Sequence, residues 1–339
     1  RTFDNMFGVF AGANGVSVGL DQGEPRPLTR SPDRLPTDIK HCYRCALDAW
    51  NEGAMDGFAT ISDAALFGSV VAATLGVPAP SRDRPVLDAI IEHLASRRVL
   101  LVLDNLEQIV MAAPDLTALL LDALGANAVL TAGDNAYDDG SASQFSQYYE
   151  PTWGRHKANT YPTPGNHDWY DGLISFLRIF CRPSSIDSKA IGGWKTRQTR
   201  SYYALRLTHR WWIWAIDIQF DTYIDNRQLD YFAEVGEALK QGDKIILITA
   251  KPSWVKVEEG RFDPPSWRNL AYFERTMVRE RGARLVITLT GDLHHYSRYQ
   301  PRTPGAGPTR ITAGGGGAYL SPTHTLPSEL ELRPAEDEE

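Results

Sequence analysis

The pattern of apolar and polar positions predicts strands at several places in the later part of the chain. A continuous apolar run, Val99–Leu103, is typical of a strand in a parallel sheet that is covered on both faces. Further short strands are predicted at Ala128–Thr131, Trp211–Asp217, Lys244–Ile248 and Arg284–Thr290. Because helical stretches separate these strands, the pattern predicts an α/β fold.

Apolar stretches that end at glycine, proline or basic residues predict the helices. They span Ile39–Trp50, Ala64–Leu75, Pro85–Ala95, Leu116–Leu124, Leu229–Leu239 and Phe273–Arg281. The strand Val99–Leu103, the helix Leu116–Leu124 and the strand Ala128–Thr131 form a predicted strand, helix, strand unit. Upstream, glycine, proline and charge alternate from Gly8 to Pro36 and predict turns or short strands.

Polar side chains follow three of the predicted strand ends. Asp134 comes shortly after Ala128–Thr131, the turn Pro164–Asp168 follows a second apolar approach, and Asp292 and His294 follow Arg284–Thr290. Ligands bind outside the carboxyl ends of strands in open α/β sheets, so these residues are predicted to share one crevice. Carboxylate and amide oxygens suit divalent cations, and imidazole suits zinc, iron or manganese. Taken singly, each has an ordinary alternative as a turn cap, a loop brace or a satisfied polar residue.

Composition narrows the function classes. The chain has 339 residues, a net charge of -7 and 42% hydrophobic residues, which favours a globular protein without a nucleic-acid-binding surface. A polyanionic substrate would then need local positive charge, such as a metal. Its apolar runs are too short to span a bilayer, so we expect no membrane insertion and favour a soluble, cytoplasmic protein. Residue 1 is Arg rather than Met, which leaves a removed signal or a trimmed start open.

The three cysteines do not predict a disulfide scaffold. Cys42 and Cys45 form a CxxC, but a second cysteine pair that would complete a zinc site is missing from the sequence. The simpler reading of this pair is two thiols at the start of a helix. The oligomeric state is not determined by the sequence.

The stretch from Ser81 to Leu121 carries the segments RRVLLVLDNLEQIV and APDL. It resembles the Walker B region of bacterial signal-transduction ATPase regulators, in which the Asp matching Asp104 helps to hold the magnesium of ATP. Phosphate binding also needs a GxxxxGK[ST] loop, and the 339 residues contain none. We therefore expect this block to be a βα scaffold that does not hydrolyse ATP.

The order of GDxxY at Gly133–Tyr137, GNHD at Gly165–Asp168 and a late strand that ends in a His motif carries a second resemblance. The chain resembles the calcineurin-like metallophosphoesterase superfamily from about residue 125 to 326. The resemblance implies a layered α/β/β/α sandwich that hydrolyses phosphomonoesters or phosphodiesters. It also implies two divalent or mixed-valence ions of Mn, Fe or Zn, which would clamp a small phosphoester substrate.

The resemblance assigns roles to individual residues. Asp134 would bridge the two metal ions and Asn166 would bind the second. His167 would protonate the leaving group or steady the phosphoryl oxygens, and Asp168 would orient His167. Tyr137 matches the tyrosine that binds ferric iron in purple acid phosphatases, with simple packing as the alternative.

Three positions depart from the family pattern. The first motif is represented only by Asp104, and the middle histidine falls on Ala250 or Lys251. The final GHxH is matched by Gly291–His294, so Asp292 supplies a carboxylate in place of an imidazole while His294 keeps its metal role. The alternative function is therefore a catalytically impaired scaffold or an ATPase-like regulatory module.

Other segments resemble a bacterial subgroup of the same superfamily. They are GNHDWYDG, TRSYYAL, PSWV and GDLHHYSRY, which begin at residues 165, 199, 252 and 291. We divide the chain into an unassigned segment at 1–58, a βα segment without a P-loop at 59–124, a metallophosphoesterase domain at 125–326 and an acidic tail at 327–339.

Overall fold

The computed structural model describes residues 7–12, 15–20, 77, 85–95, 100–103, 128–137, 139–150, 159–181, 195–196, 198–218, 223–257, 264–313, 323 and 326–332. The chain forms two compact units, Arg1–Ala126 with Gly315–Tyr319, and Asn127–Gly314 with Leu320–Glu339. The predicted helices Ile39–Trp50, Ala64–Leu75 and Leu116–Leu124 lie outside the described residues, as do Cys42, Cys45 and Asp104. Within the described part of the chain, no helix is long and apolar enough to cross a bilayer.

The first unit contains a three-stranded sheet of order β2-β1-β3. Strands β1 (Phe7–Gly12) and β2 (Gly15–Leu20) are antiparallel, and β1 is parallel to β3 (Leu100–Leu103). Helix α3 spans Val86–Ala95. The helix and the strand after it are confirmed, and the strand has a parallel partner, but it lies at the edge of a mixed sheet rather than inside a parallel one.

The predicted strand, helix, strand unit does not form one sheet. Strand β3 pairs with β1, whereas β4 (Ala128–Ala132) pairs with β5 (Asn159–Thr163) in a different sheet. The hairpin of β1 and β2 supplies the partner of β3, and short strands near the N-terminus are a weak sequence signal. The prediction was therefore wrong about which strands share a sheet, although both strands exist.

The second unit contains two sheets, and the larger has the order β11-β12-β10-β9-β8-β7. Its strands are β7 (Tyr203–Arg206), β8 (Trp211–Ala215), β9 (Lys244–Ile248), β10 (Arg284–Thr290), β11 (Tyr296–Tyr299) and β12 (Thr309–Ala313). The four inner strands are parallel, and the two edge strands are antiparallel to their neighbours. The inner parallel strands β8, β9 and β10 are mostly apolar, as expected for strands covered on both faces.

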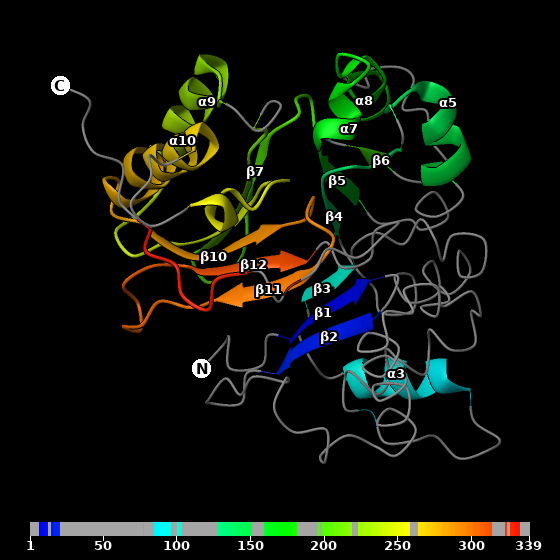
Figure 1. The fold of residues 1–339 in the computed structure, drawn as a ribbon, viewed down its shortest axis with the longest axis horizontal. Coiled ribbons are helices and arrows are strands. Elements are labelled where there is room, and N and C mark those ends of the chain that lie inside the picture. The colour runs from blue at the N-terminus through cyan, green and yellow to red at the C-terminus, as the bar shows by residue number, and fades with distance from the viewer. Residues whose placement is uncertain are drawn as a thin grey trace. The chain divides into compact units, whose positions relative to one another are not determined.

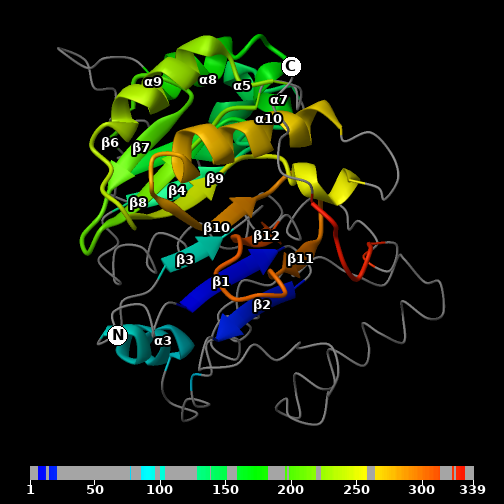
Figure 2. The ribbon, with the colours of Figure 1, turned by 90° about the vertical axis from the view of Figure 1, so that its left-hand side faces the viewer.

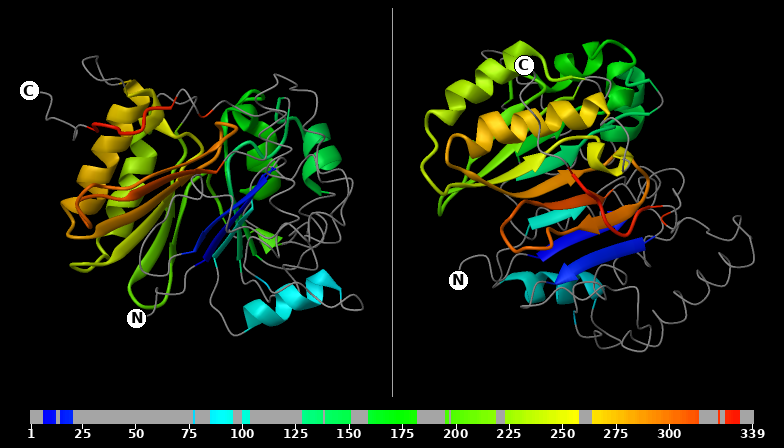
Figure 3. Two further views of the ribbon diagram at one scale, coloured as in Figure 1. Left: turned by 60° about the horizontal axis from the view of Figure 1, so that its bottom comes forward. Right: turned by 60° about the vertical axis from the view of Figure 1, so that its left-hand side comes forward.

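The smaller sheet is parallel and has the order β4-β5-β6, where β6 is Lys195–Thr196. Next to it lie α5 (Ala142–Gln144) with the π-helical turn η4 (Phe145–Tyr149), α7 (Asn166–Trp169) and α8 (Ile174–Phe180). Helices α9 (Asn226–Gly236) and α10 (Pro265–Phe273), with the turns η5 (Ser253–Lys256) and η6 (Glu274–Arg279), lie beside the larger sheet. Figures 1 and 3 show both sheets of this unit between the two groups of helices, which is an α/β/β/α arrangement.

Two helices begin earlier than the sequence predicts. Helix α9 begins at Asn226 because the side chain of Asp225 accepts a hydrogen bond from the N–H of Gln228, which caps the first turn. Helix α10 begins at Pro265, where proline suits the first helical turn, and continues into η6. The apolar pattern alone therefore missed polar and proline-rich first turns.

The main core lies between the larger sheet and its helices, on the side that Figure 2 shows covered by α9 and α10. Trp212 and Trp214 of β8 face this core together with Phe232 and Phe273. Every residue of β8 is buried, so its tryptophans contribute to the interior of the protein rather than to an exposed surface. Truncating a buried tryptophan such as Trp214 typically costs about 3–5 kcal/mol.

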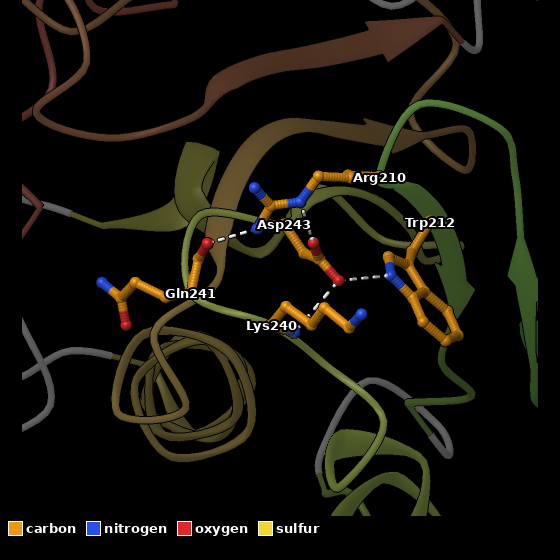
Figure 4. A network of polar contacts seen from close by, with 5 residues as sticks. All are labelled: Arg210, Trp212, Lys240, Gln241 and Asp243. Atoms are coloured by element: carbon orange, nitrogen blue, oxygen red, sulfur yellow. Dashed lines mark hydrogen bonds and ion pairs between the residues drawn. The ribbon is translucent and has the colours of Figure 1, made fainter.

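A polar network closes the end of the larger sheet where β8 and β9 begin (Figure 4). Arg210 Nε donates to Asp243 Oδ1 at 2.8 Å, and Trp212 Nε1 and the N–H of Lys240 donate to Asp243 Oδ2, each at 3.1 Å. Arg210 also donates to the carbonyl of Gln241. Arg210 and Asp243 come directly before β8 and β9, and Trp212 is the second residue of β8. The network therefore lies at the strand ends opposite the carboxyl ends.

Candidate metal and catalytic site

Asp134 stands in an unusual backbone conformation at the end of β4. Its φ is 46°, and that of the preceding Gly133 is 104°. Asp134 Oδ1 accepts a hydrogen bond from the N–H of His167 at 3.1 Å, and Oδ2 accepts one from the hydroxyl of Tyr137 at 3.1 Å. A left-handed non-glycine residue costs conformational free energy and is concentrated at functional sites.

The loop after β5 packs directly against this carboxylate. A Cβ atom on Gly165 would lie 2.1 Å from Asp134 Oδ1, so only glycine fits between the two loops. The next residues form α7, whose first turn carries Asn166, His167 and Asp168. The prediction that the ends of these two strands meet is confirmed by these contacts.

Asn166 presents a buried oxygen that lacks a hydrogen-bond partner among the described residues. Its Nδ2 donates to the hydroxyl of Tyr170 at 2.8 Å, while Oδ1 is buried and unpaired. A buried polar atom left unpaired costs roughly 1–3 kcal/mol and calls for an explanation such as an ion. The amide oxygen therefore fits the metal-ligand role that the sequence assigns to Asn166.

The side chain of Asp168 connects the loop after β4 to the loop after β5. Its Oδ2 accepts hydrogen bonds from the N–H of Gly165 at 2.9 Å and from the N–H and Nδ2 of Asn135 at 3.1 and 3.0 Å. Burial, and then the charge of Asp134, raises the pKa of Asp168 to about 7, although the hydrogen bonds from Gly165 and Asn135 lower it. The sequence assigned Asp168 to orient His167, but its hydrogen bonds go to Asn135 and Gly165 instead.

His167 lies half-buried between two aromatic rings. The centroid of its ring is 4.4 Å from that of Tyr137 and 4.9 Å from that of Tyr170. Its own N–H is bound to Asp134, so the backbone rather than the imidazole makes that contact. The ring is therefore held next to Asp134 and Asn166 while part of it stays accessible.

The end of β10 is connected to the end of β4 through Ala250, which follows β9. The N–H of Gly291, after β10, donates to the carbonyl of Ala250 at 3.0 Å. A Cβ atom on Gly133 would lie 2.7 Å from the Cβ of Ala250, so Ala250 packs against the loop of Asp134. Asp292, with a φ of 59°, and the buried His294 follow Gly291.

The described residues do not bring every predicted ligand into contact. Among them, no three His, Cys, Asp or Glu side chains converge closely enough to hold a metal ion. Asp134, Asn166, His167 and Asp168 gather at the ends of β4 and β5, and their neighbour Tyr137 is bonded to Asp134. The ligand roles of Asp292 and His294 stay predictions, and Asp104 lies outside the described residues.

A family profile described as calcineurin-like phosphoesterase matches residues 103–296, more than half of the chain. The chain belongs to the calcineurin-like phosphoesterase family. No curated protein sequence matches it. Among solved structures, a purple acid phosphatase from yellow lupin (Lupinus luteus) seeds is similar at 16% sequence identity and a TM-score of 0.42. That similarity covers 65% of this chain and 42% of the lupin chain, so this chain spans less than half of that protein.

Membership of the calcineurin-like phosphoesterase family confirms the predicted family and the calcineurin-like α/β fold. It supports a metal-dependent phosphoester hydrolase and implies divalent metal ions. The matched range begins at residue 103 and therefore includes Asp104. The resemblance of Ser81–Leu121 to a Walker B region and the proposed domain boundaries stay predictions.

Ala250 and Lys251 stand at the end of β9, where the calcineurin-like pattern has a histidine. The methyl group of Ala250 packs on Gly133, where the closeness of the two loops leaves little space. Lys251 is buried at the same strand end. Whichever of the two stands in for the middle histidine, this strand end supplies a methyl group and an ammonium group rather than an imidazole.

Sequence reasoning missed an anchor between α7 and the larger sheet. Trp169 Nε1 donates to Asp217 Oδ1 at 3.0 Å, and Asp217 lies just beyond β8. Gln228 of α9 binds both backbone groups of Asp217, at 3.0 and 2.7 Å. The sequence offers no local signal for this contact because Trp169 and Asp217 are 48 residues apart.

Proposed function

We propose that the protein hydrolyses phosphoesters at a dinuclear metal site formed by the ends of β4, β5 and β10. The observation that carries the proposal is the buried, unpaired Oδ1 of Asn166, on the residue before His167, whose N–H binds the carboxylate of Asp134. Asp134 and Asn166 would hold the ions together with Asp292 and His294. Bound divalent ions of Mn, Fe or Zn would neutralise the phosphate charge and acidify a water molecule.

Two roles fit the position of Tyr137. Its hydroxyl lies 3.1 Å from Asp134 Oδ2, close enough to bind the same ion as that carboxylate. The same hydrogen bond would alternatively orient Asp134 without contact to a metal. A tyrosine-to-ferric charge-transfer band in the visible spectrum, lost in Tyr137→Phe, would assign the ligand role.

His167 is proposed as the general acid. Its backbone is fixed by Asp134, and its ring lies between Tyr137 and Tyr170 with part of its surface accessible. From this place the imidazole would give a proton to the leaving-group oxygen, while the neighbouring Asn166 would help to hold a metal ion. Asp168 would act indirectly, because its hydrogen bonds hold the loops of Asn135 and Gly165 together.

The replacement of His167 tests this assignment. His167→Ala is expected to keep its metal ions and its fold but to lose about 10²–10⁴-fold in the hydrolysis of an aryl phosphodiester with a poor leaving group. The loss should shrink as the pKa of the leaving group falls, because a good leaving group needs less proton donation. Steady-state kinetics over a series of aryl esters, with metal analysis of each protein, measures both.

Asp134→Asn is the companion variant, expected to lose metal as well as activity. If His167→Ala also loses its metals, or if its defect is equal for good and poor leaving groups, His167 is a ligand or a phosphate clamp rather than an acid.

A second candidate is a catalytically impaired scaffold of the same family. It is favoured by Ala250 and Lys251, which occupy the strand end where the family pattern has a histidine. A purified protein that binds metal and yet hydrolyses neither phosphomonoesters nor phosphodiesters would favour the scaffold.

A further inference from the structure

Helix α7 is a single turn, and this turn carries both Asn166 and His167. One turn has little stability of its own, because helix nucleation is unfavourable, so its place depends on tertiary contacts. On one side, the N–H of His167 binds Asp134 Oδ1 after β4. On the other side, the indole of Trp169, the last residue of α7, reaches the larger sheet.

The acceptor of the indole is Asp217, which follows β8 and is 1% exposed. Trp169 Nε1 donates to Asp217 Oδ1 at 3.0 Å. The backbone of Asp217 is fixed in turn by the side chain of Gln228 in α9, which binds both its N–H and its carbonyl. Gln228 Nε2 also donates to Asp225 Oδ2, on the residue that caps α9. The carboxyl that receives the indole N–H is thus attached to the first turn of α9.

The hydrogen bond between Trp169 and Asp217 connects the two sheets of the second unit. The proposed metal ligands also come from both sheets, since Asn166 follows β5 of the smaller sheet and His294 follows β10 of the larger one. Ions held by both groups of ligands would require the two groups to keep a fixed separation. A hydrogen bond from the α7 turn to the larger sheet helps to fix that separation.

Stability alone does not account for a carboxyl at position 217. Burial raises the pKa of Asp217 to about 7, although the hydrogen bonds of Ser201 and Trp169 lower it, and the charge of Asp225 raises it as well. The ionised carboxyl is therefore less favourable in the folded protein than in water. Carboxyls with such raised pKa values are concentrated at functional sites.

We propose that Asp217 is a positioning residue of the site, which holds the α7 turn, with Asn166 and His167, in place against the larger sheet through Trp169. This inference rests on the proposed function. Trp169 is two residues after His167 and three after Asn166 in the same helical turn, so a displaced indole would displace both. Asp217 itself would touch neither the substrate nor the metal.

Trp169→Phe tests the proposal, because it removes the indole N–H and keeps an aromatic ring. At saturating Mn²⁺, this variant is expected to lose about tenfold to a hundredfold in kcat for an aryl phosphodiester with a poor leaving group, since a slightly misplaced catalytic group is costly. The KM should change little. The affinity for Mn²⁺ should fall by about tenfold, because Asn166 moves with the turn. Steady-state kinetics and calorimetric titration measure these effects.

The matched control is Trp212→Phe, which removes the hydrogen bond between another indole and a carboxyl, that of Asp243, at the opposite end of the same sheet. Both variants should lose a similar amount of thermal stability. Only Trp169→Phe should lose kcat and Mn²⁺ affinity. Equal losses of kcat in the two variants would mean that the Trp169 contact merely stabilises the fold, and would overturn the proposal.

Two further comparisons separate positioning from general damage. In the His167→Ala background, Trp169→Phe should cost little more in kcat, because the group that it displaces is already absent. Asp217→Asn keeps an acceptor for the indole and should retain more of kcat than Asp217→Ala. A full additive loss in the His167→Ala background, or equal kcat in the two Asp217 variants, would refute the role of Asp217.

The positioning role and the proposed function fail in different ways. If the unaltered protein binds Mn²⁺ but hydrolyses no phosphoester, the proposed function fails, and the Mn²⁺ affinity of Trp169→Phe still tests whether the contact positions the turn. If the unaltered protein hydrolyses the ester, and Trp169→Phe is as active and binds Mn²⁺ as tightly, only the positioning role is refuted.

Discussion

Two buried carboxylates of the larger sheet show how their surroundings set their charge. Burial raises the pKa of Asp243, but the hydrogen bonds from Lys240 and Arg210 outweigh it and hold that pKa below its ordinary value. Burial raises the pKa of Asp217 to about 7, because the hydrogen bonds it receives, including that from Trp169, do not compensate. Asp243 is therefore an anion in the folded protein at neutral pH, whereas Asp217 is about half protonated near pH 7.

Replacing Asp217 should reveal this difference as a function of pH. The folded pKa of about 7 exceeds the ordinary value of 3.8, so the folded state binds more protons between these values and the free energy of unfolding falls as pH rises through them. Asp217→Asn keeps an acceptor for Trp169 and does not titrate. The stability of the variant relative to the unaltered protein should increase from about pH 4 to 7, by at most about 4 kcal/mol, and stay constant above.

Urea unfolding at pH 5, 6, 7 and 8 measures this change, and Asp243→Asn is the control. The ionised Asp243 contributes stability above its unfolded pKa, and this stability is lost only at lower pH. The difference in free energy of unfolding between Asp243→Asn and the unaltered protein should therefore not vary between pH 5 and 8. If the difference in free energy of unfolding between Asp217→Asn and the unaltered protein does not change with pH over the same range, Asp217 is ionised throughout that range.

At the scale of elements, the loops after β4 and β5 act as one structure. Asn135 is bonded to Thr163 and Asp168, and Asp134 is bonded to His167. Each of these bonds joins residues 28 or 33 positions apart. A change in either loop should therefore disturb the ligands of both.

Gly165→Ala is the sharpest test of that coupling. The new methyl group would lie 2.1 Å from Oδ1 and 2.4 Å from the N of Asp134, and both loops must move to accept it. We expect a loss of about 1–3 kcal/mol in stability and at least tenfold in metal affinity. Calorimetric titration with Mn²⁺ or Zn²⁺ and thermal unfolding measure the two effects.

Gly307→Ala is the matched control, because a Cβ atom there meets nothing within 4 Å. It should leave metal affinity unchanged. Equal metal affinity in Gly165→Ala and the unaltered protein would mean that metal binding does not depend on the contact between the loops after β4 and β5.

The elements that the sequence predicted are those with a strong local pattern. The runs at β8, β9 and β10 are mostly apolar, and their boundaries were predicted to within two residues. Strand β7 and strand β11 lie at sheet edges with half-buried side chains, so their patterns are weak and only their pairing with β8 and β12 makes them strands.

The same reasoning separates the site residues that were predicted from those that were missed. Asp134, Asn166 and His167 stand in short motifs at strand ends, which a reading of consecutive residues can find. Asn135 and Asp217 act through partners far along the chain, and Asp168 was placed correctly in the motif but bonds to the loops rather than to the imidazole. Such contacts depend on tertiary structure and leave no periodic signal.

At the scale of the whole molecule, the second unit has a stabilising polar network and the candidate site at opposite ends of its strands. The network around Asp243 (Figure 4) closes one end of the larger sheet. The candidate site occupies the carboxyl ends of strands. Metal binding would add contacts only at the second of these ends. It should therefore stabilise the folded chain without a need for other rearrangement.

Metal addition to the metal-free protein should accordingly raise its melting temperature. A ligand bound only by the folded state contributes about 2.7 kcal/mol at a concentration one hundred times its Kd. Elemental analysis should find close to two transition-metal ions per chain, and the thermal shift should vanish in Asp134→Asn. A protein that takes up no metal and gains no stability with manganese, zinc or iron would refute the site.

The left-handed backbone of Asp134 has a consequence for how the activity could be lost. Asparagine and aspartate visit this conformation more readily than most other residues with a side chain, and asparagine keeps an oxygen that can accept the N–H of His167. A single base change turns an aspartate codon into an asparagine codon. If the chain hydrolyses phosphoesters as proposed, it lies one mutational step from a pseudoenzyme that retains its shape, so shape alone is a poor guide to which members of such a lineage remain enzymes.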